Sequence, residues 1–316
     1  MTSTSFDPGA VRLRLRWQAG SATGFDLRVE RPAVATIMRG RQADQAVRSI
    51  PLLYSICSAA QAAAAQLALQ AARGMAQEPV IDDGVRTEAM REHLWRLLLD
   101  WPRMLGLQLQ ERLLAEARRR LADADFQAWM AAELSGPFEQ IEAAARALPA
   151  FAAADGSPFL PPLAAAETVA LWPRLDAAFA AAPMYCGAAA ETGALARHDE
   201  ITGAAPLAAR IRARIADLHE SNGLGRVSAA PVATGVGRAA VETARGLLVH
   251  EITLDGERIA EYVIVAPTEW NFHPHGRLRA WLANSEAATP EALRALAAQA
   301  VLALDPCVRC AIDIDA

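Results

Sequence analysis

The sequence has little of several features that would mark common classes of protein. Four cysteines among 316 residues are too few for the disulfide framework of a small secreted protein. Lys and Arg total 31 against 36 Asp and Glu, so the basic footprint of a nucleic-acid-binding protein is missing and no nucleic-acid partner is expected. The longest apolar run, around residues 59–72, is interrupted by Gln61, Gln66 and Gln70. It is too short and too polar to span a bilayer, so no membrane partner is expected either.

The first residues also lack the charged and apolar regions of a secretory signal peptide. Together with the scarcity of cysteine, this predicts the reducing environment of the cytoplasm. Hydrophobic residues make up 53% of the chain, enough to bury a large core. We expect a single domain over residues 1–316, with a loop or linker in the Pro- and Gly-rich residues 156–162.

The hydrophobic patterns predict a mainly helical α+β fold with small antiparallel β units. Alternation of apolar and polar residues predicts one hairpin over residues 11–17 and 25–29. A second hairpin, over residues 246–252 and 258–265, would turn at Asp255-Gly256. Helical periodicity, with breaks at Pro102 and at Gly136-Pro137, predicts helices over residues 59–73, 87–99, 107–121, 126–148 and 290–304.

The chemistry of the sequence concentrates in its thiols. Cys307 and Cys310 form a Cys-x-x-Cys pair directly after the last expected helix, and Cys57 precedes an alanine-rich one. Such a pair could be a redox dithiol or half of a zinc site, and a lone cysteine before an apolar helix is often a small buried hydrophobe. A metal ion shared by the three thiols would instead fix the terminal pair to the body of the protein, because thiolates favour iron, zinc, nickel or copper. Cys186, among alanines, is interpreted as structural.

Other motifs have simpler interpretations. A structural zinc site needs four Cys or His ligands, and the sequence has no second Cys-x-x-Cys and no His-x(3–5)-His pair to complete one. Gly235-Val-Gly237 mimics a dinucleotide-binding loop, but no βαβ unit with a downstream acid follows it. His273 and His275 flank a proline, which is more typical of an exposed loop than of a metal site.

Six segments in the same order over nearly the whole chain resemble motifs of the large subunit of nickel-iron hydrogenases. The last, Asp-Pro-Cys-Val-Arg-Cys at residues 305–310, is similar to the Asp-Pro-Cys-x-x-Cys of that family. Residues 242–250 are similar to Glu-Ala-Pro-Arg-Gly-x-Leu-Gly-His, and residues 266–271 to Val-Pro-Thr-Thr-Trp-Asn. The other three segments are residues 40–46, 55–62 and 191–197. The resemblance implies a shortened, mainly helical fold like that of the large subunit.

The departures from the enzyme motifs concern the nickel site. In the enzymes, the first cysteine of each pair is a terminal nickel ligand and the second bridges nickel and iron. The resemblance places Tyr54 at the first upstream cysteine and Cys57 at the second. It therefore implies that Cys57 and Cys310 are thiolate ligands of iron, that Cys307 is a further, exchangeable thiol, and that no nickel is bound.

Three more departures imply that the chain is neither catalytic nor processed. The histidine after the upstream pair corresponds to Gln61, and the glutamate that relays protons corresponds to Ala35. The histidine at which a maturation protease removes a tail corresponds to Asp313.

Two positions keep chemistry that faces the diatomic ligands of iron in the enzymes. The resemblance implies that Arg245 and Thr268 donate hydrogen bonds to cyanide, where a charged donor is favoured. The alternative interpretations are that Arg245 pairs with a carboxylate and that Thr268 caps the segment containing Trp270 and Asn271.

In sum of these matches and departures, the sequence resembles the cytoplasmic hydrogenase assembly proteins of the HupK/HoxV group. This implies a maturation factor, and no enzyme, that binds an Fe(CN)2(CO) fragment and helps to deliver it to the hydrogenase large-subunit precursor, with small maturation chaperones as further partners. One alternative is a degenerate or atypical nickel-iron hydrogenase large subunit with redox activity. Another is a metal-free decoy that recruits maturation proteins.

Overall fold

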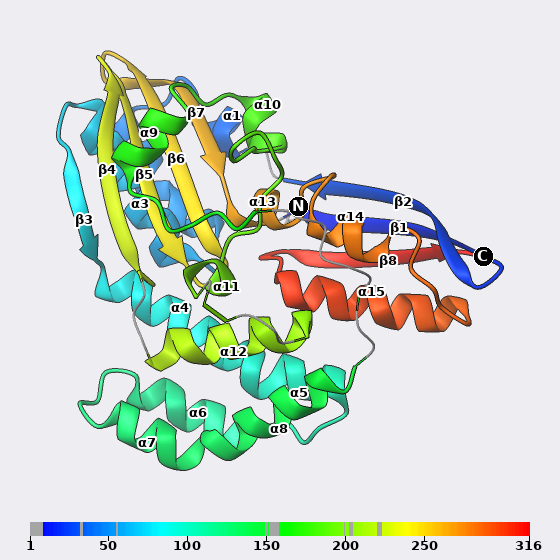
Figure 1. The fold of residues 1–316 in the computed structure, drawn as a ribbon. Helices are drawn as coiled ribbons and strands as arrows, with labels where there is room; N and C mark the ends of the chain where they lie inside the picture. Colours follow the sequence, from blue (N-terminus) through cyan, green and yellow to red (C-terminus); the bar gives the residue numbers. More distant parts are fainter. Residues whose placement is uncertain are drawn as a thin grey trace, which may run out of the picture.

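The computed structural model describes residues 9–31, 34–54, 56–148, 151, 158–198, 200–201, 205–219 and 223–316. Figure 1 shows a five-stranded sheet at the upper left, a three-stranded sheet at the right and a group of helices below both. The first and last strands of the chain lie side by side in the three-stranded sheet.

The five-stranded sheet is antiparallel throughout. Its strands follow each other in the order β3-β4-β5-β6-β7. The central strand is buried along its whole length, because α3 (Ser58–Ala72) covers one face of the sheet and α9 (Ala165–Leu171) lies on the other. The strands are β3 (Gln77–Ile81), β4 (Arg226–Ala233), β5 (Val236–Thr243), β6 (Gly246–Asp255) and β7 (Arg258–Val265).

A close approach of backbones explains the glycine at position 237 in β5. A Cβ atom on Gly237 would lie only 2.0 Å from the backbone nitrogen of Ala72, so the residue must be glycine for α3 to pack this closely. The facing side of α3 is correspondingly built of small residues such as Ala65 and Ala68, which are fully buried. The Gly-x-Gly motif thus serves helix–sheet packing, in agreement with its interpretation as a false dinucleotide motif.

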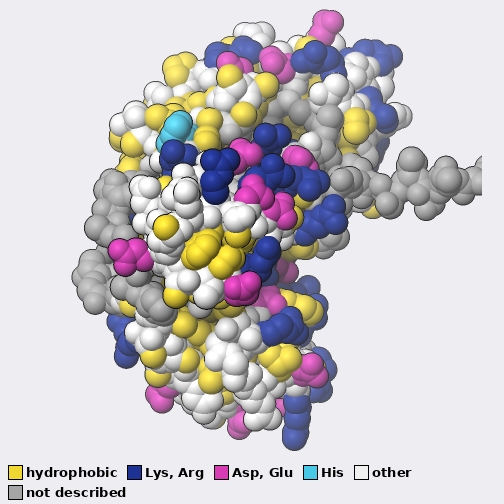
Figure 2. Space-filling view, turned by 90° about the vertical axis from the view of Figure 1, so that its right-hand side faces the viewer, with side chains coloured by type: hydrophobic (Ala, Val, Ile, Leu, Met, Phe, Trp, Pro, Cys, Tyr) yellow, Lys and Arg dark blue, Asp and Glu magenta, His cyan; other side chains and the backbone are white. Residues whose placement is uncertain are grey.

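The three-stranded sheet joins the two ends of the chain. β1 (Ala10–Gln18) pairs antiparallel with β2 (Ser21–Glu30) and parallel with β8 (Arg309–Asp315). Val11, Leu13 and Leu15 point into the core, as their alternation predicts. On the wet face, Arg12 pairs with Glu30. Figure 2 shows basic and acidic side chains interspersed on the face it presents, without a stripe of one sign.

The helices below the sheets enclose the largest hydrophobic cluster, which includes Leu97, Trp101, Phe138 and Leu304. They are α4 (Asp83–Trp95), the π-helical η2 (Arg96–Asp100), α5 (Trp101–Leu105), α6 (Glu111–Arg120), α7 (Phe126–Glu133), α8 (Ser135–Arg146), α12 (Pro206–His219) and α15 (Pro290–Leu304). The remaining short helices are α1 (Val34–Met38), α2 (Ala43–Ser49), η1 (Ile50–Leu53), α10 (Ala177–Ala181), α11 (Ala194–Arg197), α13 (Pro267–Asn271) and α14 (Arg277–Leu282). Within the described ranges, no helix is both long and apolar enough to cross a membrane.

Both predicted hairpins and the last helix are confirmed, but the predicted break at Pro102 is wrong. The helical path continues from Asp83 through η2 to Leu105 and ends at Gly106, whose φ is +69°. The π-helical turn changes the hydrogen-bond pattern just before the proline, so the missing N–H does not end the helix. The second predicted break falls at Leu134, because Pro137 fits the first turn of α8.

Two further features depart from the sequence expectations, and a third is described only in part. β8 pairs in parallel with β1, whereas only antiparallel β units were expected. The predicted second hairpin is part of a sheet that also contains β3, β4 and β5. The loop predicted at residues 156–162 falls partly outside the described residues; where the chain is described, Phe159 bridges to Glu191.

Candidate metal-binding site

The candidate site lies where five segments distant in sequence meet. Cys57 is the residue before α3, and Cys307 lies in the turn between α15 and β8. Thr268 belongs to α13, Arg245 lies in the tight turn between β5 and β6, and Arg31 directly follows β2. The two sheets and the last helix therefore all contribute to the position of the thiols.

Cys307 is surrounded by donors. Its Sγ lies 3.2 Å from the hydroxyl of Thr268 and accepts a hydrogen bond of 3.2 Å from Nη1 of Arg31. The backbone N–H of Cys307 also donates to the Thr268 hydroxyl, at 3.3 Å. Thr268 does not cap α13, because Ala266 is the N-cap residue and Glu269 accepts from its backbone N–H at 2.9 Å. The capping interpretation of Thr268 is therefore wrong, and its hydroxyl contacts the thiol instead.

Cys57 lines a small pocket together with Arg245, whose guanidinium also interacts electrostatically with Cys307. Burial, with a further contribution from Cys307, raises the pKa of Cys57 to about 12, although Arg245 and a hydrogen bond from Gln61 act in the opposite direction. At neutral pH this thiol is protonated. A metal that binds here must release the proton, so metal binding is coupled to pH.

Cys310 occupies a different environment. Its residue pairs with Val11 in the three-stranded sheet, and its side chain packs against the largest hydrophobic cluster. Burial alone raises the pKa of Cys310 to about 12, with no contribution from the charges that act on Cys57. Cys57 and Cys307 thus share the charge of Arg245, whereas Cys310 does not, and the roles of all three as metal ligands stay predictions. Cys186 is exposed in the turn closed by Tyr185 and Ala188.

Two thiols are fewer than a resident metal ion needs. Across the part of the chain that the structure describes, no group of three or more Cys, His, Asp or Glu side chains is arranged to hold a metal.

Arg245 both pairs with carboxylates and lies beside the thiols. Its Nη2 donates to Glu92 at 2.9 Å, and its Nε lies 3.3 Å from Asp305. This confirms the interpretation that Arg245 pairs with a carboxylate. The same guanidinium acts electrostatically on Cys57 and Cys307, so the pairing does not remove it from the site.

Asp305 organises the turn that carries Cys307. It caps the end of α15 with a left-handed φ of +53° and is almost completely buried. Its carboxylate accepts from Nε of Arg96 at 2.7 Å and from Nη1 of Arg214 at 2.9 Å. Burial raises the pKa of Asp305, but the charges of Arg245, Arg96 and Arg214 outweigh burial and hold it well below its usual range. The aspartate is therefore ionised and fixes the chain two residues before the thiol.

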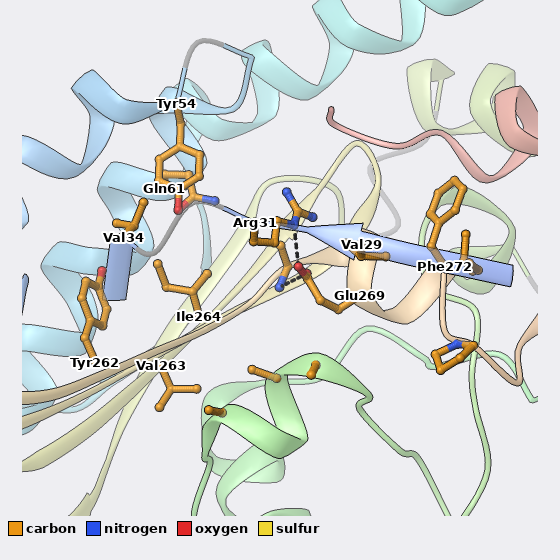
Figure 3. A pocket seen from close by; sticks show the side chains of 16 residues that line it. Val29, Arg31, Val34, Tyr54, Gln61, Tyr262, Val263, Ile264, Glu269 and Phe272 are labelled. Atoms are coloured by element: carbon orange, nitrogen blue, oxygen red, sulfur yellow. Dashed lines mark hydrogen bonds and ion pairs between the residues drawn. The ribbon is translucent and has the colours of Figure 1, made fainter. Parts of the chain in front are cut away.

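A cavity of about 380 Å³ adjoins the site. Figure 3 shows Arg31, Tyr54, Gln61 and Glu269 at its polar end, with apolar side chains such as Ile264 along its walls. Neither Cys57 nor Cys307 lines it. Burial raises the pKa of Tyr54, so its hydroxyl stays neutral and is a poor metal ligand. The side chain of Ala35 lies outside the described residues.

Comparison with known proteins identifies the family to which the chain belongs. A sequence model described as nickel-dependent hydrogenase matches residues 207–313. A hydrogenase expression/formation protein HupK from Azotobacter vinelandii is 34% identical over 95% of this chain and 97% of its own length. HupK from Rhizobium leguminosarum bv. viciae is 32% identical, over 97% and 96% of the two chains. This chain belongs to the HupK/HoxV family of hydrogenase expression/formation proteins.

Within the same family, HoxV from Cupriavidus necator is 29% identical over 95% of this chain and 94% of its own. The fold is that of a shortened hydrogenase large subunit. The reduced nickel-iron-selenium hydrogenase of D. vulgaris Hildenborough superimposes with a TM-score of 0.56 at 14% identity, over 92% of this chain and 94% of that one. The reduced, active enzyme from Desulfomicrobium baculatum gives 0.55 at 13% identity, over 93% and 95%.

Sequence reasoning missed the charged residues that hold the site. Arg31 donates a hydrogen bond to Glu269. Arg96 and Arg214 donate to Asp305, and Arg245 donates to Glu92. The only available signal was at residue 269, where the enzyme motif has threonine and this chain has glutamate.

Proposed function

We propose that this HupK/HoxV-family protein is a hydrogenase maturation factor that binds an Fe(CN)2(CO) fragment through cysteine thiolates. Its partners would be the hydrogenase large-subunit precursor, to which the fragment is delivered, and small maturation chaperones. The protein would act as a scaffold and not as an enzyme. No nickel is expected in it.

The observation that carries the proposal is the set of three donors around Cys307, one of which, Arg245, also lies beside Cys57. The guanidinium groups of Arg245 and Arg31 and the hydroxyl of Thr268 all act on Cys307. Cyanide nitrogen is an anionic acceptor, for which such donors give short, charge-assisted hydrogen bonds. Donors of this kind would have little use around a structural zinc ion bound by four protein ligands.

The small number of protein ligands suits a carrier. Two thiolates hold an iron fragment less firmly than four, so the fragment can be released to a site that offers more bonds. Cys57 and Cys307 would be the anchors that the structure favours. Cys310, one residue into β8, would be an exchange thiol if it takes part at all, which reverses the order expected from the enzyme motifs.

Relatives support the maturation role, because their names describe hydrogenase expression and formation. Of the alternatives, an atypical hydrogenase is disfavoured by Tyr54, a buried phenol where the enzymes have a nickel thiolate. A metal-free decoy is disfavoured by Nη2 of Arg31 beside Cys307, which is buried and has no hydrogen-bond partner within the described residues.

The test is infrared spectroscopy of protein purified without oxygen after production in cells that assemble hydrogenase. We expect cyanide and carbon monoxide bands with about one iron per chain. Cys57→Ser and Cys307→Ser should abolish both, because a hydroxyl is a harder and less ionised ligand than a thiolate. Cys186→Ser, the matched control, should retain them. Equal loss in Cys186→Ser, or iron without diatomic ligands, would contradict the proposal.

A further inference from the structure

Arg31 separates the cavity from Cys307. It lines the cavity, whereas Cys307 does not. Its Nε donates to Glu269 at 2.5 Å and its Nη1 donates to Cys307 Sγ at 3.2 Å. Figure 3 shows this guanidinium beside Tyr54 and Gln61 at the polar end. Arg31 therefore contacts the thiol and borders the cavity at the same time.

The guanidinium stands where a metal cation would otherwise be attracted. It bridges a carboxylate and a thiol, and Cys57 lies within electrostatic reach of that thiol. Carboxylate and thiolate together are ligands that Zn²⁺ and similar ions bind. Arg31 already balances their charge, and a second cation here would be repelled through a medium of low dielectric constant.

One N–H of the same guanidinium is left over. Nη2 of Arg31 is buried and has no hydrogen-bond partner within the described ranges of the chain. Gln61, also on the cavity wall, has a buried Oε1 in the same state. A buried unsatisfied donor is costly, so its presence at a cavity points to an acceptor that arrives with a ligand.

We propose that Arg31 makes the thiol site selective: it excludes hydrated divalent metal ions from Cys57 and Cys307, and it offers Nη2 to an anionic metal complex instead. The second half rests on the proposed function, since it takes the cyanide-bearing iron fragment as the anionic ligand. The first half concerns the unloaded protein and can be tested without that fragment.

The experiment is anaerobic titration of the reduced, unloaded protein with Co²⁺, followed by thiolate-to-cobalt charge-transfer absorption. Wild-type protein should show no stoichiometric thiolate band. Arg31→Gln removes the cation and frees Glu269, so it should bind one equivalent with an affinity about tenfold to a thousandfold higher, the range expected for removing one neighbouring like charge. Arg31→Lys keeps the charge and should behave like wild type.

Two controls assign the effect. Arg28→Gln changes an exposed arginine of β2 that pairs with Asp26, and it should not alter cobalt binding. Adding Cys307→Ser to Arg31→Gln should remove the charge-transfer band. If Arg31→Gln does not fold, as judged by circular dichroism, the double variant Arg31→Gln with Glu269→Gln leaves no buried unpaired carboxylate and takes its place.

Stoichiometric cobalt–thiolate binding by the wild type would overturn the proposal, and so would a folded Arg31→Gln variant that binds no better than wild type. These results are independent of the cargo. Infrared bands in the wild type together with an unchanged Arg31→Gln titration would refute the selectivity role alone. Cobalt exclusion by Arg31 in a protein that never carries cyanide would refute the proposed function alone.

Discussion

Cys57, before the first long helix, and Cys307, beyond the last, both lie within the influence of Arg245 although they stand far apart in the chain. Each is held by a different part of the fold: Cys57 by the helix that covers the five-stranded sheet, and Cys307 by the turn that Asp305 anchors. The relative position of the two thiols therefore depends on the packing of the whole molecule. Five predictions follow from their surroundings.

Alkylation should distinguish the thiols. Burial raises the pKa of Cys57 and of Cys310 to about 12, so little thiolate exists at pH 7, and Cys186 is exposed. Because the thiolate is the nucleophile, iodoacetamide should label Cys186 first and the other two slowly, at rates that rise with pH up to about 12. Mass spectrometry of the labelled peptides measures the order. Labelling of Cys57 as fast as that of Cys186 at pH 7 would contradict the burial of the site.

Loading with iron should become more favourable as pH rises. Cys57 is protonated below its raised pKa and must lose the proton to bind metal. Each proton released gives about a tenfold gain in affinity per pH unit. The cyanide bands retained at equilibrium between pH 7 and 9 measure the trend, and circular dichroism of the unloaded protein over the same range is the control. A pH-independent affinity would mean that the ligand thiol is already ionised.

Asp305→Asn should destabilise the protein by about 3–5 kcal/mol, because it leaves buried arginines without their carboxylate. Asparagine tolerates the left-handed conformation of residue 305, so the loss reports on charge and not on backbone strain. Urea unfolding measures it. Asp26→Asn, which breaks only an exposed pair with Arg28, should cost less than about 1 kcal/mol. Similar losses in both variants would refute the anchoring role of Asp305.

The hydroxyl of Thr268 should matter more than its methyl group. Thr268→Val leaves the backbone N–H of Cys307 without its acceptor, at a cost of about 1–3 kcal/mol, and removes the contact with Sγ. Thr268→Ser keeps the hydroxyl and should retain both stability and iron loading. Denaturant unfolding and infrared spectra of the two variants make the comparison. If valine and serine behave alike, the hydroxyl has no part in the site.

Arg245 should show a structural and a ligand-facing role together. Arg245→Gln leaves Glu92 and Asp305 short of a cation and should lower the free energy of unfolding by about 3–5 kcal/mol. Arg245→Lys keeps the charge but loses the planar donor fork, so it should be more stable than the glutamine variant. In loaded protein, the lysine variant should shift the cyanide stretching frequencies and lose iron faster. Unchanged frequencies in Arg245→Lys would remove Arg245 from the ligand-facing residues.

The sequence predicted the elements whose patterns are local. The helix over residues 290–304 has a proline at its start and a regular apolar stripe, and the structure places it at the same residues. β4 and β5 were not predicted because both segments are rich in alanine, and Pro231 inside β4 and Gly237 inside β5 weaken the strand signal further. Their strand form depends on burial under α3, a contact between distant segments.

The candidate site likewise contains residues that the sequence predicted and residues that it did not. Motif resemblance identified Cys57, Cys307, Arg245 and Thr268, and the fold brings them together around one thiol. The pairing of Arg31 with Glu269 joins residues far apart in sequence, so no local pattern could predict it. The motif resemblance also grouped Cys310 with these thiols, but strand β8 begins between Cys307 and Cys310 and takes Cys310 into the sheet.

The parallel pairing of β8 with β1 helps to hold the turn that carries Cys307. β1 precedes every other described element in sequence, and its partner β8 follows all of them. Without residues 309–315 the edge of β1 is open, and the turn that carries Cys307 is held only on the side of α15. The position of Cys307 therefore depends on a contact between the two strands that lie farthest apart in the described sequence.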